Sequence, residues 1–176
     1  MIHLSGIKTG LQINLHRNKS ARGVDIRFLF RHTYYMTTEY FLYIDELGNA
    51  FRIHAEGNSL LETQQCVDGL ISIVDAEING IATDMVVNDM GLFRNDFMIN
   101  PIASTACQYD DAVIVGPVVL TKHDGHGATI GYTDEEINAF GLEITGTFHA
   151  EEMKDVRDEI LDALPEDTKN ALIRPL

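Results

Sequence analysis

The chain has 176 residues, of which 45% are apolar, and carries a formal net charge of −14 at neutral pH. This length suits one ordinary domain with its own core, and no apolar run approaches the roughly 18 residues of a membrane-spanning helix. The two cysteines, Cys66 and Cys107, provide neither a disulfide framework nor a four-cysteine zinc site. Because the N-terminus lacks the apolar core of a signal peptide, we expect a cytoplasmic protein with no membrane association.

The charge is unevenly distributed along the chain. Residues 1–35 hold six lysines and arginines but a single acidic residue, a net of +5, so the remaining residues carry −19. A body this acidic repels the phosphates of nucleic acids, which predicts no direct binding to them. The acidity serves either solubility, for instance in a salty cytoplasm, or a surface that competes with nucleic acid for a basic partner.

Residues 1–35 also differ from the rest in pattern. A basic, polar stretch at residues 17–23 precedes an apolar stretch at residues 24–35, and Met36 opens a segment that resembles the beginning of a protein. The sequence is therefore consistent with a translation start at Met1 or at Met36. We predict three parts: a basic N-terminal extension or arm over residues 1–35, an α+β core over residues 36–120, and an acidic, mainly helical part over residues 121–176 packed on the core.

Short runs rich in β-branched and aromatic residues predict the strands. The predicted strands are residues 40–44, 50–54, 70–78, 81–87, 112–120 and 142–148. Asn79-Gly80 between two of them is the strongest signal for a two-residue hairpin. Pro117 lies inside the most apolar run and favours an edge strand or a bulge there.

Capping residues and apolar periodicity predict four helices. Asn58 or Ser59 can cap a helix that ends near Gly69, Pro101 fits the first position of another, and Thr133 with Glu136 forms a capping box. The amphipathic pattern of residues 149–164 predicts a longer C-terminal helix. We therefore expect an α+β fold with a small, mostly antiparallel sheet, hairpins, short helices and a C-terminal amphipathic helix.

The first helix also has a predicted orientation. Its apolar side would hold Leu60 and Leu61 together with Cys66, and Ser59 followed by Glu62 has the spacing of a capping box.

Residues 36 to about 120 resemble a family of small phage and plasmid proteins of unknown function, marked by an Asn-Glu-Glu-Gly motif after a hairpin. Asn88-Asp89-Met90-Gly91 occupies the place of this motif, with Asp89 and Met90 instead of the two glutamates. A helix at residues 60–69, a segment at residues 100–104 and a closing strand at residues 114–119 follow the order of the family. The resemblance implies a mobile-element origin, hence a host cytoplasm if phage-encoded, but no activity.

Asn88, Asp89, Gly91 and Asn100 form the first candidate site. The amide and carboxylate groups at this strand end can bind a ligand or a partner. Turn chemistry explains the same residues, because Asn and Asp bond their own backbone and Gly91 would take a positive φ.

A row of carboxylates on the C-terminal helix forms the second candidate site. Successive turns bring these groups to one side of the helix, where they are either a solvated surface or a contact for a basic partner. The row, here called the acidic face, consists of Glu151, Asp155, Asp158, Glu159 and Asp162.

No catalytic, cofactor or metal motif stands out. His123, Asp124 and His126 could ligate a divalent metal, but a Gly-rich loop without a further ligand explains them better. Cys66 lies among apolar residues, where cysteine usually behaves as a small buried hydrophobe. We therefore predict no catalytic residues, no metal and no cofactor, and an enzyme is the less favoured interpretation.

The expected function is that of a phage or plasmid accessory protein that acts by protein–protein interaction. Its partner would be a basic host or phage protein, for example a host nucleic-acid-binding or defence protein that it inhibits through the acidic surface. The alternative is a small-ligand, nucleotide-like binder or minor enzyme with a pocket near Asn88, Asp89 and Asn100. The oligomeric state stays open.

Overall fold

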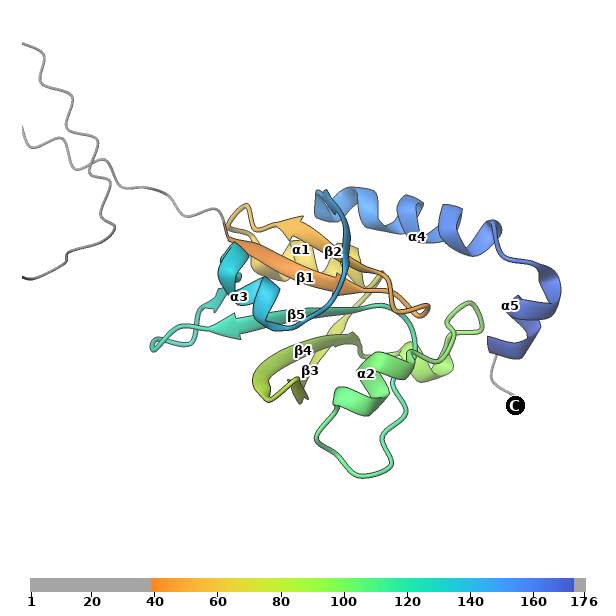
Figure 1. Ribbon diagram of the computed structural model, residues 1–176, viewed down its shortest axis with the longest axis horizontal. Coiled ribbons are helices and arrows are strands. Elements are labelled where there is room, and N and C mark those ends of the chain that lie inside the picture. Colours follow the sequence, from red (N-terminus) through yellow and green to blue (C-terminus); the bar gives the residue numbers. More distant parts are fainter. Residues whose placement is uncertain (1–38, 173–176) are drawn as a thin grey trace, which may run out of the picture. The chain divides into compact units, whose positions relative to one another are not determined.

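The computed structural model describes residues 39–172, for the last three of which only the backbone is described (Figure 1). The predicted N-terminal extension and the alternative start at Met36 lie outside the described residues. Within residues 39–172, no helix has the length and apolarity needed to cross a membrane.

Seven strands form one mixed sheet in the order β3-β4-β5-β1-β2-β7, with β6 paired to β5. The strands are β1 (Tyr40–Ile44), β2 (Ala50–His54), β3 (Ile71–Ile78), β4 (Ile81–Asn88), β5 (Val118–His123), β6 (Thr129–Ile130) and β7 (Ile144–Phe148). All neighbours are antiparallel except β2 and β7, which run parallel. The predicted α+β class and mostly antiparallel sheet are therefore confirmed.

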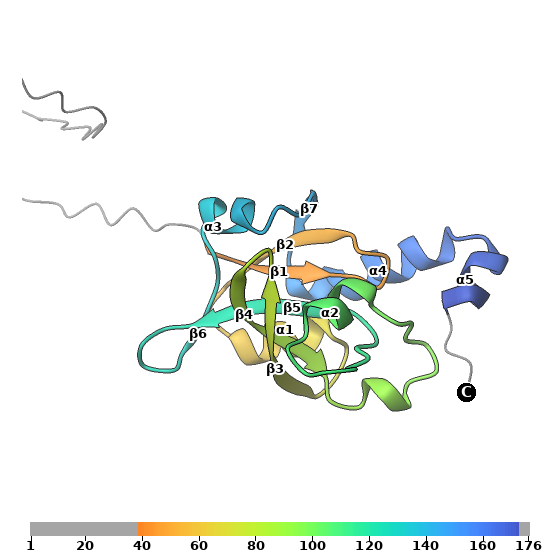
Figure 2. The ribbon, with the colours of Figure 1, turned by 60° about the horizontal axis from the view of Figure 1, so that its bottom comes forward.

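Short helices connect and cover these strands (Figures 1 and 2). They are α1 (Ser59–Cys66), η1 (Gly91–Phe93), α2 (Pro101–Ala106), α3 (Asp134–Ala139), η2 (Ala150–Glu152), α4 (Met153–Asp162) and α5 (Glu166–Leu172), where η denotes a 3-10 helix. Thr133 and Glu136 make the predicted capping box of α3. The predicted C-terminal helix is present as η2 followed by α4.

The sheet has a separate hydrophobic cluster on each face, and β1 contributes to both. Leu42 and Ile44 join the cluster that contains residues of α2 and α3. Phe41 and Tyr43 join the cluster that contains Cys66 at the end of α1 and residues of α4. Since successive side chains of a strand point to opposite faces, this alternation places α1 and α4 on one side of the sheet.

The β3–β4 hairpin follows from its turn residues. Asn79 and Gly80 have φ values of 51° and 79°, the left-handed conformations that a type I′ turn requires. The eight residue pairs from Ile71↔Asn88 to Ile78↔Ile81 are in continuous register. The hairpin predicted at Asn79-Gly80 is therefore confirmed.

Two details of the prediction are wrong around Pro117. The strand predicted at residues 112–120 begins only at Val118 and continues to His123. It also lies between β1 and β4, not at an edge. Pro117 has no N–H for a ladder and stands just before the strand, while Gly116 instead donates to the carbonyl of Met98 at 2.8 Å.

The predicted orientation of α1 is also wrong. Asn58 caps this helix by accepting from the N–H of Leu61 at 3.4 Å, so Ser59 lies inside the helix and forms no capping box. Leu60 and Leu61 are exposed, whereas Cys66 is buried. At 3.6 residues per turn Leu61 and Cys66 lie roughly 140° apart, so one side cannot bury both.

Candidate functional site

Asn88 ends β4 and uses its side-chain amide to hold the neighbouring loop. Its Nδ2 donates to the carbonyls of Val67 at 2.9 Å and Asp68 at 3.0 Å. Its Oδ1 accepts from the N–H of Met90 at 2.8 Å. The residue is 7% exposed, so this amide joins the end of α1 to the turn after β4.

Asn100 also uses its side-chain amide to bond neighbouring backbone groups, at the start of α2. Its buried Nδ2 donates to the carbonyls of Ile44 at 3.3 Å, Asp45 at 3.1 Å and Gly116 at 3.2 Å. Its Oδ1 caps α2 by accepting from Ala103 at 3.0 Å. Both asparagine amides are therefore occupied by backbone groups, and a ligand would have to displace these bonds.

Asp89 and Gly91 lie in the turn after Asn88. Asp89 is exposed and accepts from the hydroxyl of Ser72 at 2.5 Å. Gly91 begins η1 and does not have the positive φ that the turn interpretation predicts. Space is tight there, because a Cβ would lie 3.2 Å from Cγ2 and 3.3 Å from the carbonyl oxygen of Val115.

Two of the three candidate metal ligands, His123 and Asp124, bond other groups of the protein. Nδ1 of His123 lies 2.8 Å from Oδ2 of Asp84, and this hydrogen bond raises the pKa of His123. Asp124 accepts from the N–H groups of Ala128 and His126 in the loop, which lowers its pKa. Within residues 39–172, no group of three His, Cys, Asp or Glu side chains is arranged to hold a metal ion.

Two residues with nucleophilic groups, Cys66 and Thr83, are enclosed or hydrogen-bonded. Cys66 is 2% exposed, and burial raises the pKa of its thiol to about 12. Thr83 lies beside the His123–Asp84 pair, but its hydroxyl donates to the carbonyl of Thr121 at 3.0 Å and shares a hydrogen bond with Tyr132. Neither residue offers a nucleophile that a neighbouring base activates.

All five residues of the acidic face are exposed, but they do not lie on one helix as predicted: Glu151 is in η2, and Asp155, Asp158, Glu159 and Asp162 are in α4. The opposite side of α4 packs on the core through buried Met153 and half-buried Val156 and Ile160. Asp158 and Asp162 have ion-pair partners, at 3.3 Å from Arg157 and 3.9 Å from Lys169. Within residues 39–172, Glu151, Asp155 and Glu159 have none.

A buried ion pair fixes α4 to the sheet. Nη2 of Arg157 lies 2.5 Å from Oε1 of Glu46, and Nε lies 3.1 Å from both carboxylate oxygens. The two residues are 7% and 1% exposed. Arg157 also donates to the carbonyl of Asp96 at 3.0 Å, and its guanidinium carbon lies 5.0 Å from the centroid of the Phe97 ring. The acidic face therefore stands on a helix with a fixed position.

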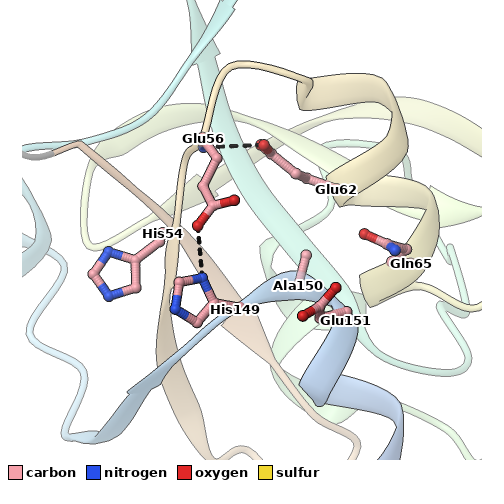
Figure 3. A pocket seen from close by; sticks show the side chains of 7 residues that line it. All are labelled: His54, Glu56, Glu62, Gln65, His149, Ala150 and Glu151. Atoms are coloured by element: carbon pink, nitrogen blue, oxygen red, sulfur yellow. Dashed lines mark hydrogen bonds and ion pairs between the residues drawn. The ribbon is translucent and has the colours of Figure 1, made fainter.

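An open pocket of about 210 Å³, which we call the imidazole pocket, lies where the end of β2, α1 and η2 meet (Figure 3). Its polar lining consists of His54, Glu56, Glu62, Gln65, His149 and Glu151. The rings of His54 and His149 are stacked, with centroids 4.9 Å apart and planes at 27°. Nδ1 of His149 lies 2.7 Å from Oε1 of Glu56.

Glu62 is the buried member of the imidazole pocket. Its Oε1 accepts from the N–H groups of Glu56 at 3.0 Å and Asn58 at 3.1 Å. Its Oε2 is buried and has no hydrogen-bond partner within the described part of the chain. An unpaired buried acceptor costs about 1–3 kcal/mol, and more when it is charged. One carboxylate oxygen of this lining residue is therefore enclosed by the protein without a donor.

Sequence reasoning did not find the imidazole pocket. His54 and His149 are 95 residues apart and show no motif spacing. Glu62 was predicted as a capping-box residue of the helix, and it does bond backbone N–H groups, but at a different position. Glu151 was predicted as part of the acidic face, and it also lines the pocket, so the two features adjoin.

The fold and the site define an α+β protein with a fixed acidic helix beside a small polar pocket. The chain belongs to the family described as Domain of unknown function (DUF3846), whose model matches residues 36–149. The match includes His54, Glu62 and His149 of the imidazole pocket and ends before α4. No curated protein and no solved structure matched the chain.

Proposed function

We propose that the protein acts by binding a basic partner protein through the acidic face, without catalysis. The observation that carries this proposal is the exposure of four carboxylates on one side of α4, which the Arg157–Glu46 pair fixes to the core, with a fifth, Glu151, exposed on the preceding η2. Three of them, Glu151, Asp155 and Glu159, have no cation at ion-pair distance within residues 39–172. These groups are therefore available to cations of a partner.

The spacing of the carboxylates supports a contact with a surface that binds phosphates. A helix rises about 1.5 Å per residue, so Asp155, the pair Asp158 and Glu159, and Asp162 follow one another at roughly 5 Å. Single exposed ion pairs contribute only about 0–1 kcal/mol. A fixed row of like charges acts collectively, by steering a basic partner toward it and favouring one orientation.

The resemblance to small phage and plasmid proteins supports a more specific form of the proposal. In this form the partner is a host nucleic-acid-binding or defence protein, and the protein inhibits it by occupying the basic surface that otherwise holds nucleic acid. Origin from a mobile element and a location in the host cytoplasm belong to the same proposal.

The test compares two variants with the same change in net charge. The face variant is Asp155→Asn, Asp158→Asn, Glu159→Gln and Asp162→Asn. The control variant neutralises four exposed carboxylates elsewhere: Glu77→Gln, Asp110→Asn, Glu135→Gln and Glu143→Gln. We expect immobilised wild-type protein and the control variant to retain the same basic protein from a host lysate, and the face variant to lose it.

Competition by nucleic acid identifies the surface of the retained partner. Added DNA should release the partner from the wild-type protein, because both would bind the same basic surface. Retention by the face variant at the wild-type level would contradict the proposal. Equal loss with both variants would show that net charge, and not the acidic face, is responsible.

The alternative function, a small-ligand binder or minor enzyme with a pocket near Asn88, Asp89 and Asn100, lacks a supporting observation among residues 39–172. The amides of Asn88 and Asn100 are bonded to backbone groups, and Asp89 is an exposed turn residue. We therefore do not advance it as a second candidate.

A further inference from the structure

We propose that β3 pairs with the β3 of a second copy, so that two sheets join into one continuous sheet in a twofold-symmetric dimer. Strand β3 is the last strand in the order of the sheet, next to β4 (Figure 2). This inference goes beyond the proposed function, because the residues that carry it lie on β3 and after β4, and none belongs to the acidic face.

Within residues 39–172, the outer edge of β3 is covered over only part of its length. In its second half, the carbonyl of Asp75 accepts from the N–H of Gln108 at 3.0 Å, and Ala76 forms an isolated antiparallel bridge with Cys107. The first half, residues 71–73, has no such bond or bridge within the described part of the chain. An uncovered strand edge is a template for pairing with another strand.

Two hydrogen bonds show which backbone groups of β3 point outward. The carbonyl of Leu70 accepts from the N–H of Asp89, at the end of β4, at 2.8 Å, whereas the carbonyl of Asp75 bonds on the opposite side. Because residues of an antiparallel strand alternate in direction, the even-numbered residues bond β4 and the odd-numbered residues face the edge. The N–H and C=O groups of Ile71 and Ile73 therefore point outward, and they have no partner there among residues 39–172.

These outward groups allow one symmetric register. If Ser72 of one copy lies opposite Ser72 of the other, Ile71 of each copy faces Ile73 of the other, and four N–H···O=C bonds can form. A register shifted by two residues would engage either Asp75, whose carbonyl is already bonded, or Gly69, whose N–H donates to a carbonyl of α1 at 3.0 Å. The accessible backbone therefore specifies an antiparallel pair centred on Ser72.

The same register matches apolar side chains on both faces of the joined sheet. On the face that carries α1 and α4, Ile71 packs partly on the hydrophobic cluster, and Ile73 is exposed. On the other face, Val74 packs partly on the second cluster, and Leu70 is exposed. In the dimer, Ile73 would face Ile71 of the second copy, and Leu70 would face Val74 of the second copy. Each exposed side chain would thus contact one that is already anchored in a core, and such cross-strand pairs stabilise a sheet.

The composition of this edge favours a second copy as the occupant. Natural proteins commonly protect a free edge with charged residues or proline. Residues 70–74 contain neither, although the chain as a whole is strongly acidic. The charged side chains of β3, Asp75 and Glu77, follow only in its second half. A stretch that is apolar on both faces around a central serine is complementary to its own antiparallel copy.

The apolar surface at this edge is large enough for a dimer. It includes five side chains that are 49–78% exposed, on β3 or in the segments beside it: Leu70, Ile73, Met90, Leu92 and Phe93. The bond from Asp89 to the carbonyl of Leu70 places the segment after β4 beside this edge. At about 150–200 Å² for a large apolar side chain, the five expose roughly 500 Å². Two copies would bury about 1,000–1,200 Å², the lower end of specific interfaces, so we expect a micromolar dissociation constant.

The first experiment measures the mass of the full chain by sedimentation equilibrium at about 1–100 μM. We expect the wild type to change from monomer to dimer over this range. Ile73→Lys places a charge in the joined sheet and should weaken dimerisation at least about tenfold. The matched control Thr145→Lys makes the same positive change at an exposed position of β7, at the opposite edge of the sheet, and should dimerise like the wild type. If circular dichroism shows that Ile73→Lys does not fold, Leu70→Lys takes its place.

The second experiment tests the register with engineered cysteines. In a pair centred on Ser72, the two Ser72 Cα atoms lie about 4.5 Å apart, within the range of a disulfide. Ser72→Cys should therefore form a disulfide-linked dimer on mild oxidation, visible on a non-reducing gel. In the matched variant Val74→Cys, the two cysteines would be four residues out of register, roughly 14 Å apart along the strand, and should not link. The wild type, with Cys66 and Cys107, gives the background of the assay.

Three results would overturn the inference: a wild type that stays monomeric at about 100 μM, a dimer that persists in both Ile73→Lys and Leu70→Lys, or equal linking through Ser72→Cys and Val74→Cys. Salt separates this dimer from the proposed function. Added NaCl screens the repulsion between two acidic copies and should strengthen the dimer, whereas it should weaken the binding of a basic partner to the acidic face. A dimer that weakens with salt would also contradict the inference, because it would indicate charge pairing.

Discussion

Replacement of Arg157 by methionine should remove the buried ion pair that joins α4 to the turn between β1 and β2. Within the described part of the chain, every hydrogen bond to the carboxylate of Glu46 comes from Arg157. The side chain of Glu46 is 0% exposed, so the substitution leaves a carboxylate buried without a counterion. Breaking such a pair costs about 3–5 kcal/mol. For a domain of this size, this loss corresponds to a fall in Tm of roughly 10 °C or more.

The double variant Arg157→Met with Glu46→Leu shows whether stability depends on the presence of the ion pair or on not leaving one charge buried alone. Burial opposes the charge of Arg157, but the hydrogen bonds and charge of Glu46 outweigh it, so the pKa of Arg157 is raised. Arg157→Met combined with Glu46→Leu removes both desolvation penalties together. We therefore expect the double variant to lie within about 1–2 kcal/mol of the wild type, although each single variant loses more.

The assay is urea unfolding followed by circular dichroism for the wild type, both single variants and the double variant. Lys154→Met is the matched control on the same helix, because Lys154 makes an exposed ion pair with Asp68 at 3.3 Å. It should cost less than about 1 kcal/mol. A loss of under about 1 kcal/mol in Arg157→Met, or additive losses in the double variant, would refute the reasoning.

Four other perturbations test separate parts of the structure. Gly116→Ala should cost about 2–4 kcal/mol of unfolding free energy in urea, because φ is 78° and the new Cβ would overlap a phenyl ring. Gly80→Ala, at φ 79° with open space, should cost about 1 kcal/mol. Cys66, with its thiol pKa raised by burial to about 12, should resist alkylation at pH 8 until the protein unfolds, as measured by mass spectrometry. The hydrogen bond to Asp84 raises the pKa of His123 above its usual 6.5. The stabilisation of the folded protein by this pair is therefore fully present below pH 6.5 and is lost as the pH rises through the pKa of the folded state. An NMR titration should show a lower pKa of His123 in Asp84→Asn.

Each of these predictions has a result that contradicts it. If Gly116→Ala costs no more than Gly80→Ala, the contact with the phenyl ring is unimportant. Rapid alkylation of Cys66 under native conditions would show that the thiol is not enclosed. An unchanged pKa of His123 in Asp84→Asn would show that another group causes the shift.

Local chemistry made several elements predictable. The Asn79-Gly80 turn forms because these residues reach left-handed conformations easily. Thr133 and Glu136 satisfy the free N–H groups at the start of α3 from within the same turn. The four carboxylates of the acidic face that lie on α4 follow from helical periodicity. In each case the interacting groups are only a few residues apart, so their spacing in the sequence specifies the contact.

Long-range pairing limited the prediction elsewhere. The apolar run at residues 112–120 indicates burial, but its strand begins at Val118 because Pro117 cannot donate to a ladder and the preceding residues bond the segment before α2. Likewise, the resemblance directed attention to Asn88 and Asn100, whereas their backbone partners lie on other elements. Apolarity and residue type predict that a group is buried, but they do not predict which group it contacts.

The sequence by itself determined the α+β class, the hairpins, the capped helices and the exposed row of carboxylates, because each depends on neighbouring residues. Only the tertiary structure decided that Arg157 meets Glu46 across 111 positions and that His54, Glu62 and His149 line one pocket. The physical reason is that these contacts depend on the order of strands in the sheet and the packing of α1, η2 and α4 beside it. No local spacing encodes that arrangement.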